Sequence, residues 1–404
     1  MNYSELLEIL EEKKEICIFG AGILGRGEGY LFIKNMLEEG QRINYFCDNN
    51  ILAGTEIVDG IQTIEVSYLY EHSNEVVCVI MAKGSSLYEI KEQLEGHNLK
   101  TYMLDEYSIF SICGEIMRGG DRKYILRVKK FMKERRYEVQ IETSSFCNAQ
   151  CSFCPNTTLK RKKNIMNQVI FNKIIERIKQ EEIDVSTFIL HLNGEPLTDS
   201  QIFMRIKELK SEFPTARIRF TSNFALATTE VIEQIIESGL DEITCSLNAI
   251  DADQYKKIMG LDYEKTVSNI ECLLKRKRET GSNLKICLSI VVDIGEDEKV
   301  EKFKERWKDV DIRVMKLGAW VDKEIPQNLC VSERDGICPI LYRTINFLSN
   351  GDYALCCFDP EGIVNHNVMY STIEEAWASP VFSEVREWHL KYGRTNKECI
   401  NCSF

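Results

Sequence analysis

Between residues 137 and 318 the chain alternates short apolar segments with amphipathic ones, and this alternation constrains the fold more than any other feature. Six segments have the length and composition of strands: 137–143, 187–193, 216–223, 241–248, 284–292 and 312–318. Segments with helical periodicity lie between them, at 166–182, 201–212, 228–239, 263–280 and 297–308. Strands that alternate with helices form parallel sheets. Six such repeats predict an α/β fold, a partial (β/α)6 TIM-like barrel that is open on one side.

Residues 1–115 show the same alternation on a smaller scale and predict a separate Rossmann-like parallel sheet. An apolar strand at 16–19 is followed by GAGILG and then by a helical segment, and a second strand ends just before Asp48. Gly20, Gly22 and Gly25 satisfy G-x-G-x-x-G in the context of strand, turn and helix. Such glycines let phosphate oxygens approach the backbone, and Asp48 can accept ribose hydroxyls. The alternative is a degenerate module that serves packing or dimerisation.

The composition excludes several classes of protein. A formal net charge of −12 argues against a nucleic-acid binder, and the basic run at 160–163 is interpreted as a solvated loop. The longest apolar runs, such as 75–82, are too short to cross a bilayer. The amino-terminal segment has no signal-peptide core, so we expect a cytoplasmic protein without membrane or nucleic-acid partners.

The chain has 16 cysteines, and their positions divide them into two groups. In a reducing compartment the expected uses of cysteine are metal ligation, catalysis and small apolar filling. Single cysteines inside apolar or periodic segments are predicted to be buried filler: Cys17, Cys47, Cys78, Cys245, Cys272 and Cys287. The clustered cysteines, in 147–154 and 338–402, require another explanation.

Cys147, Cys151 and Cys154 are spaced C-x3-C-x2-C directly after the first predicted barrel strand. The loops at the carboxyl ends of the strands carry the chemistry of such barrels. A structural zinc site needs four ligands, whereas three thiolates suit a 4Fe-4S cluster with one open iron. The spacing therefore favours an iron–sulfur cluster, with a zinc or purely structural site as the alternative.

The chain between 137 and 320 resembles the radical S-adenosylmethionine (SAM) enzymes. C-x3-C-x-F-C, with Phe153 before the last cysteine, is similar to the signature of that family. Asn193-Gly194-Glu195-Pro196 resembles its G-G-E motif, with Asn in place of the first Gly. Thr221-Ser222-Asn223 and Ser246-Leu247-Asn248 stand where the family often has T-N-G and S-L-D-G.

The resemblance implies roles for these residues. The three cysteines would hold the reducing cluster, SAM would chelate the open iron, and Phe153 would pack near the adenine. Residues that end the next three strands would line the SAM site: Asn193, Gly194, Glu195, Ser222, Asn223, Ser246 and Asn248. The Glu195 carboxylate would bind the methionine ammonium. His191, which alternates along the same strand, is interpreted as a satisfied interior residue. The family also implies a flavodoxin- or ferredoxin-type electron donor.

The last cysteines form a second pattern. Cys338, Gly351 and Cys356 are spaced C-x12-G-x4-C, and Cys399 and Cys402 follow as C-x2-C. This arrangement resembles the twitch domain, a shortened SPASM domain, and the four cysteines would fully ligate one auxiliary 4Fe-4S cluster. A zinc knuckle is the alternative. Cys357 is a spare thiol and, with Cys330 and Cys287, a candidate hydrogen donor.

These predictions divide the chain into a nucleotide or nucleotide-sugar module (1–115), a helical connector (116–136), a radical SAM barrel (137–325) and an auxiliary-cluster domain (326–404). We expect oxidation or epimerisation of a sugar, aminocyclitol or nucleotide sugar by a 5′-deoxyadenosyl radical, with the auxiliary cluster as electron conduit. Peptide modification is the second hypothesis. A zinc-containing nicotinamide-dependent dehydrogenase is an alternative of another class.

Overall fold

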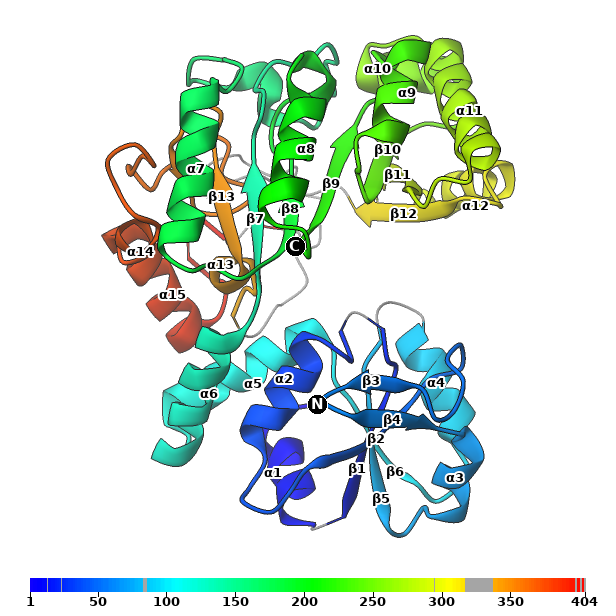
Figure 1. Ribbon diagram of the computed structural model, residues 1–404, viewed down its shortest axis with the longest axis vertical. Helices are drawn as coiled ribbons and strands as arrows, with labels where there is room; N and C mark the ends of the chain where they lie inside the picture. Colours follow the sequence, from blue (N-terminus) through cyan, green and yellow to red (C-terminus); the bar gives the residue numbers. More distant parts are fainter. Residues whose placement is uncertain are drawn as a thin grey trace. The chain divides into compact units, whose positions relative to one another are not determined.

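Figure 1 shows the computed structural model of the chain. It describes residues 1–404 except Lys13, Ile23, 83–85, Ile294, 317–336, Lys397, Ile400, Asn401, Ser403 and Phe404. The chain divides into two compact units. The first comprises Met1–Arg135, Arg334–Tyr342 and Arg386–Thr395, and the second comprises Arg136–Glu333, Arg343–Val385 and Asn396–Phe404. The predicted division into four domains stays a prediction.

The first unit is built on a six-stranded sheet with the order β3-β4-β2-β1-β5-β6. Its strands are β1 (Glu15–Phe19), β2 (Ile43–Cys47), β3 (Glu56–Val58), β4 (Ile61–Ile64), β5 (Val76–Ile80) and β6 (Lys100–Met103). All neighbouring strands are parallel except β3, which pairs antiparallel with β4. The parallel order β4-β2-β1-β5-β6 confirms the Rossmann-like prediction and places the topological switch point between β1 and β5.

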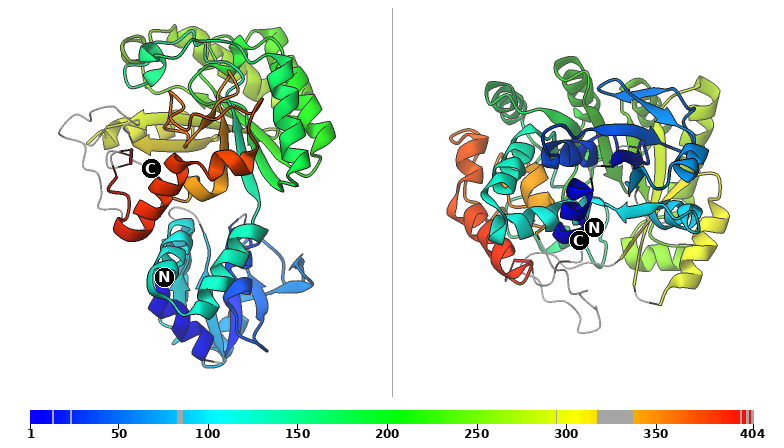
Figure 2. Two further views of the ribbon diagram at one scale, coloured as in Figure 1. Left: turned by 90° about the vertical axis from the view of Figure 1, so that its left-hand side faces the viewer. Right: turned by 90° about the horizontal axis from the view of Figure 1, so that it is seen from below.

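Helices cover both faces of this sheet (Figures 1 and 2). They are α1 (Tyr3–Glu11), α2 (Glu28–Met36), α3 (Val66–Glu71), α4 (Ser86–Leu94), α5 (Glu106–Gly119) and α6 (Arg122–Glu134). Alternate residues of β1 enter two cores, because successive side chains of a strand point to opposite faces. Ile16 and Ile18 pack with α1, α2, α5 and α6, whereas Cys17 and Phe19 pack with α3 and α4. The predicted connector 116–136 thus contributes to the first core.

The second unit contains an eight-stranded sheet with the order β12-β11-β10-β9-β8-β7-β13-β14. Its six successive parallel strands are β7 (Tyr137–Ile141), β8 (Val185–Ile189), β9 (Arg217–Ser222), β10 (Glu242–Ser246), β11 (Lys285–Val292) and β12 (Asp311–Lys316). The helices between them are α7 (Gln168–Gln180), α8 (Ile202–Glu212), α9 (Thr229–Glu237), α10 (Ala252–Met259), α11 (Tyr263–Thr280) and α12 (Asp297–Arg306). Each strand pairs with the next along the chain, and β12 lies at the sheet edge. This confirms the predicted partial (β/α)6 barrel.

The sheet extends beyond β7 in a way that the sequence did not indicate. β13 (Thr344–Phe347) pairs parallel with β7, and β14 (Tyr353–Ala354) pairs antiparallel with β13. The short helices α13 (Ile340–Arg343) and α14 (Ile373–Trp377) and the longer α15 (Pro380–Tyr392) complete the carboxyl-terminal part. The region predicted as a separate cysteine-rich domain therefore adds strands to the barrel sheet, and β13 is buried along its whole length.

Five of the six cysteines predicted as buried filler are confirmed as buried: Cys17, Cys47, Cys78, Cys245 and Cys287. Cys272, the sixth, is half-buried on α11. Of the helices that the structure describes, none combines the length and the hydropathy that crossing a membrane requires.

Candidate active site

The cysteine loop follows β7 at the carboxyl end of the barrel and is anchored on two sides by its backbone. The Glu195 amide donates to the carbonyl of Phe146 (2.8 Å), which ties the loop to the segment after β8. The amides of Gln150 and Ser152 donate to the carbonyls of Met259 and Ile258, at the end of α10 (2.9 and 3.0 Å). The loop is therefore held by neighbours on both sides.

The three thiols lie near one another on this loop. Cys147 Sγ accepts from the Ala149 amide (3.4 Å) and from Nδ2 of Asn223 (3.7 Å), while Cys151 Sγ contacts Met259 Sδ (3.2 Å). Burial raises the pKa of Cys147 to about 11 and that of Cys151 to about 12, with smaller contributions from Glu195 and the neighbouring thiols. A metal must therefore displace protons from these thiols to bind.

The donor set fits the cluster that the spacing predicts, since three thiols on one tight loop suit iron. In the described part of the chain, no three histidine, cysteine or acidic side chains are placed closely enough to hold a metal ion as they stand. Cluster ligation is therefore inferred from the donor type and the loop position. Phe153, between the second and third cysteines, is half-buried.

The Asn193–Glu195 segment lies against the cysteine loop so closely that only glycine fits at its centre. A Cβ on Gly194 would lie 1.9 Å from the carbonyl oxygen of Ser144. The side-chain amide of Asn193 is buried, and none of its polar atoms has a hydrogen-bond partner among the described residues. Buried amides are normally satisfied, so this amide is a free donor and acceptor beside the predicted SAM site. We take the orphaned amide and the glycine contact as the structural fit for the cofactor.

Glu195 ties the ends of β8 and β9 together. Its carboxylate accepts from Ser222 Oγ (2.7 Å), the Asn223 amide (2.7 Å) and the Leu197 amide (3.1 Å). Burial raises the pKa of Glu195, and these three hydrogen bonds counter that rise. The side chain thus has internal partners as well as the predicted role toward an ammonium group.

Ser246 and Asn248 lie at the carboxyl end of β10, as the alternation predicts, and alternate with the fully buried Cys245 and Leu247. Ser246 Oγ is 3.1 Å from Ser289 Oγ on β11. Asn248 accepts from the Val291 amide (3.0 Å) and donates to Met259 Sδ (3.2 Å). Because Met259 also contacts Cys151, it connects the β10 end to the cysteine loop, a role that the sequence did not reveal.

The concave face of the barrel carries charged and polar side chains. Arg313 on β12 donates to Thr244 Oγ1 (3.2 Å) and pairs with Glu242, both on β10. These strands are separated by β11, so the contacts cross the concave side. On β9, Arg217 and Arg219 alternate with the buried Ile218 and Phe220.

His191 follows β8 and is half-buried, with one of its two ring nitrogens hydrogen-bonded to the chain. Its Nδ1 accepts from the Thr221 amide (3.0 Å), so the proton of the neutral ring is on Nε2. Burial, together with the charges of Arg219 and Arg313, lowers the pKa of His191 to about 3. The ring is therefore neutral over the physiological range.

The basic run 160–163 is not a purely solvated loop, and that prediction was wrong for Arg161. Arg161 Nη2 donates to the fully buried Glu142 (2.6 Å), and its Nε donates to the carbonyl of Pro360 (2.6 Å). Glu142 also accepts from the amides of Asn193 and Ser349 (3.2 and 3.0 Å). In the sequence, the Arg161–Glu142 pair is signalled only by the basic run itself and by a glutamate near the end of the first predicted barrel strand.

The carboxyl-terminal cysteines are distributed over both units. Cys338 is buried in the first unit, and its amide donates to Nδ1 of His389 (3.4 Å). Cys356 and Cys357 follow β14 after one intervening residue, and the Cys402 amide donates to the carbonyl of Cys399 (2.9 Å) in the second unit. Their ligation of one cluster stays a prediction, as does the role of Cys357. Cys330 lies outside the described residues.

The glycine loop of the first unit has a structural explanation. A Cβ on Gly20 would lie 2.3 Å from the Met81 carbonyl oxygen, and one on Gly25 would lie 1.7 Å from that of Gly20. Asp48 accepts from the amides of Ala21 and Asn50 (both 2.8 Å). Only Gly22, which has no atom within 4 Å of an added Cβ, lacks a packing reason. Packing thus accounts for most of the motif.

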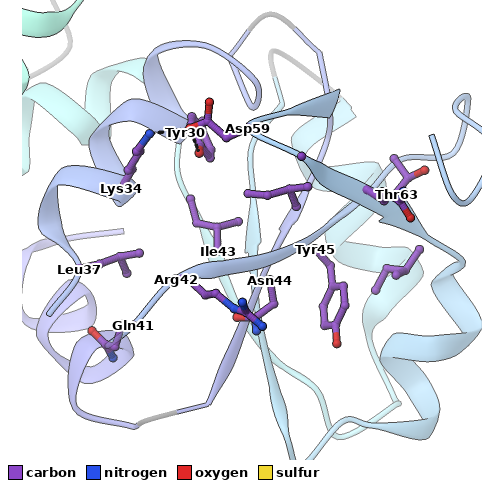
Figure 3. Close-up of a pocket in the computed structure, with 14 residues that line it drawn as sticks. Tyr30, Lys34, Leu37, Gln41, Arg42, Ile43, Asn44, Tyr45, Asp59 and Thr63 are labelled. Carbon is purple, nitrogen blue, oxygen red and sulfur yellow. Dashed lines mark hydrogen bonds and ion pairs between the residues drawn. The ribbon is translucent and has the colours of Figure 1, made fainter. Parts of the chain in front are cut away.

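A pocket of about 610 Å³ lies elsewhere in the first unit, beside α2, β2 and β4 (Figure 3). Lys34 and the hydroxyl of Tyr30 both bind Asp59 in the β3–β4 turn (2.5 and 2.6 Å). The pocket reaches the amino-terminal end of β2 at Ile43, whereas Rossmann sheets bind nucleotides beyond the carboxyl ends. It does not coincide with the predicted nucleotide site.

Comparison with known proteins decides the family. Residues 141–306 match the Radical SAM superfamily, and residues 338–403 match the SPASM iron–sulfur cluster-binding domain. The chain contains a radical SAM domain and a SPASM domain. SAM and iron–sulfur clusters are accordingly its cofactors.

Named relatives of this radical SAM protein catalyse different reactions. It is 24% identical over 134 residues to an S-adenosyl-L-methionine-dependent 2-deoxy-scyllo-inosamine dehydrogenase of Niallia circulans, covering 32% of this chain and 53% of that one. It is 24% identical over 212 residues to a GTP 3′,8-cyclase of Chlorobaculum tepidum, covering 52% and 62%. The chain thus spans about half the length of the curated relatives it matches.

Among solved structures, native anSMEcpe with bound AdoMet is similar with a TM-score of 0.50 and 14% identity, covering 64% of this chain and 88% of that one. This likeness supports the fold.

Proposed function

We propose that this radical SAM protein abstracts hydrogen from a carbohydrate-type small molecule and thereby oxidises or epimerises it. When bound at the cysteine loop, the cluster and SAM supply reductive cleavage of the C5′–S bond to a 5′-deoxyadenosyl radical. The observation that carries the proposal is the joining of the cysteine loop, the Asn193–Glu195 segment and the ends of β9 and β10 at one edge of the barrel.

The chain's own residues would position and shield the reactants. Asn193 offers a buried side-chain amide that has no hydrogen-bond partner among the described residues, and the concave face offers the Ser246 and Ser289 hydroxyls and the Thr244 side chain. A substrate rich in hydroxyl groups can exchange hydrogen bonds with such a surface without leaving buried polar groups unpaired. An apolar substrate would leave the buried Asn193 amide unpaired. This polar surface supports a carbohydrate over an apolar substrate.

Anaerobic reconstitution with iron and sulfide tests the proposal. We expect bound iron and sulfide, and 5′-deoxyadenosine release on reduction with SAM. Triple substitution of Cys147, Cys151 and Cys154 by Ala should abolish both the release and the SAM-dependent change in the electron paramagnetic resonance spectrum, because SAM chelates the open iron. The matched control is Cys272→Ala, a half-buried thiol on α11.

Bound zinc without SAM cleavage would contradict the proposal and support a nicotinamide-dependent dehydrogenase. Substrate class is tested by deuterium transfer into 5′-deoxyadenosine from labelled sugars, sugar nucleotides and peptides. Transfer from a peptide alone would replace the carbohydrate hypothesis by peptide modification.

A further inference from the structure

Arg219 on β9 lies among four charged side chains, Arg217, Arg313, Glu138 and Glu242. Arg217 and Arg313 both pair with Glu242, on its two oxygens (3.2 and 2.5 Å). Arg343 pairs with Glu138 (3.5 Å). Arg219 remains. Over the part of the chain that the structure describes, no acceptor lies within hydrogen-bond or ion-pair distance of its guanidinium, although Arg219 is partly buried.

Two hydrogen-bond donors stand near this guanidinium. Arg219 and Arg313 both act electrostatically on His191, which places the three side chains in one neighbourhood. The Thr221 amide donates to Nδ1 of His191 (3.0 Å), so the opposite nitrogen, Nε2, carries a hydrogen that can be donated. The neighbourhood therefore offers donors, and its two carboxylates, Glu138 and Glu242, are already paired with other arginines.

We propose that Arg219, assisted by the Nε2–H of His191, binds an anionic group of the substrate, a phosphate or a carboxylate, inside the barrel. The planar guanidinium can form two parallel hydrogen bonds to either group. Such an ion would supply the acceptor that Arg219 does not find among the described residues, and a partly desolvated charge is stabilised by a partner. His191 lies two residues before Asn193, so the anion site would be adjacent to the predicted SAM-binding segment.

This inference rests on the proposed function and narrows it to anionic carbohydrates. A sugar phosphate, a nucleotide sugar or a sugar acid carries the required charge. A cationic aminocyclitol would meet like charge at Arg219. The substrate of this protein is thus expected to differ in charge from the 2-deoxy-scyllo-inosamine named for one relative.

Titration calorimetry on the full-length chain, at ionic strength held constant with potassium chloride, tests the inference without turnover. Pyrophosphate and glucuronate serve as the two probes. We expect saturable binding of at least one, weakened about tenfold or more by Arg219→Gln, because a charge-assisted hydrogen bond contributes roughly 10- to 100-fold in affinity. The probe that binds identifies the source as phosphate or carboxylate. Arg219→Lys keeps the positive charge but loses the planar guanidinium with its two parallel donors. Its affinity for the probe should therefore lie between that of wild type and that of Arg219→Gln.

Arg217→Gln is the matched control, since Arg217 lies on the same strand and face but is paired with Glu242. It should change the affinity less than about threefold, a difference below 1 kcal/mol. Equal losses in Arg217→Gln and Arg219→Gln, or no saturable binding of either probe, would overturn the anion site. Should Arg219→Gln fail to fold, as judged by circular dichroism, Arg219→Lys with the same control decides.

The two proposals fail separately. Release of 5′-deoxyadenosine without anion binding refutes only the anion site. Anion binding that depends on Arg219, in a protein that does not cleave SAM, refutes only the radical chemistry.

Discussion

At the scale of single residues, burial decides what His191 can do. The ring accepts a backbone hydrogen bond and lies near two guanidinium groups, so protonating it would bury a third positive charge. The unfolded chain has an ordinary histidine pKa of about 6.5. Between that value and about 3, the unfolded chain therefore binds a proton that the folded chain does not. Folding stability falls as the pH drops through this window.

His191→Gln should remove part of this pH dependence, because the glutamine amide oxygen can still accept from Thr221 but does not titrate. Wild type should lose up to about 2 kcal/mol of stability between pH 6.5 and pH 5 through this group, as 1.5 pH units permit. Thermal melting at both pH values measures the loss. The exposed His97 provides the control. If His97→Gln flattened the pH profile as much as His191→Gln, the burial argument would fail.

Arg161 and Glu142 form the second decisive residue pair. Both side chains are buried, at 9% and 0% exposure, and Glu142 also accepts two backbone amides. A buried pair contributes little net stability, but breaking it leaves an uncompensated charge. The pair therefore matters chiefly through the cost of removing one partner.

Arg161→Ala should destabilise the second unit by roughly 3 kcal/mol, measured by urea unfolding. The neighbouring Lys162 is exposed, and Lys162→Ala should change stability by less than about 0.5 kcal/mol. Similar losses in the two variants would show that the basic run acts through general charge rather than through the buried contact.

At the scale of elements, the site depends on how closely two loops approach. The segment after β8 passes the cysteine loop at Gly194, where a Cβ would overlap the Ser144 carbonyl oxygen at 1.9 Å. No rotamer change relieves this contact, because the positions of a Cβ and of a carbonyl oxygen are both fixed by the backbone. An added methyl group would therefore push the two loops apart.

Gly194→Ala should weaken SAM binding by at least about tenfold in the reconstituted protein, because misplacement by about 1 Å is costly at such sites. Equilibrium binding of SAM measures the effect. Gly22→Ala, whose Cβ meets no atom within 4 Å, is the control and should bind SAM normally. Wild-type affinity in Gly194→Ala would refute the need for this close approach.

At the scale of the whole molecule, the chain forms two compact units with their own cores. The first is continuous in space but not in sequence, since Arg334–Tyr342 and Arg386–Thr395 join Met1–Arg135. Buried Ile337 and partly buried Leu390 belong to the core formed by α1, α2, α5 and α6. Units with separate cores often unfold in separate steps.

Calorimetry should therefore resolve two unfolding transitions. In the reconstituted protein, SAM at about 100 times its Kd should stabilise only the transition of the second unit, by roughly 2.7 kcal/mol. Gly25→Ala, which forces a Cβ to 1.7 Å from the Gly20 carbonyl oxygen, should lower only the other transition. A single transition that responds to both changes would show that the units unfold together.

The sequence by itself determined the features that depend on local order. The six barrel strands follow from apolar alternation over a few residues, and the observed bounds lie close to the predicted ones. The position of the cysteines after β7 and of Asn193–Glu195 after β8 follows from the same alternation. The family motifs could be recognised because their residues lie close together in the chain.

Only the tertiary structure decided the contacts between distant segments. The pairing of β13 with β7, the contact of Arg161 with both Glu142 and Pro360, and the meeting of Met259 with Cys151 join residues far apart along the chain. The absence of a partner for Arg219, among the described residues, became visible only once every neighbouring strand was in place. Such contacts depend on the path of the whole backbone, and local periodicity in the sequence does not predict that path.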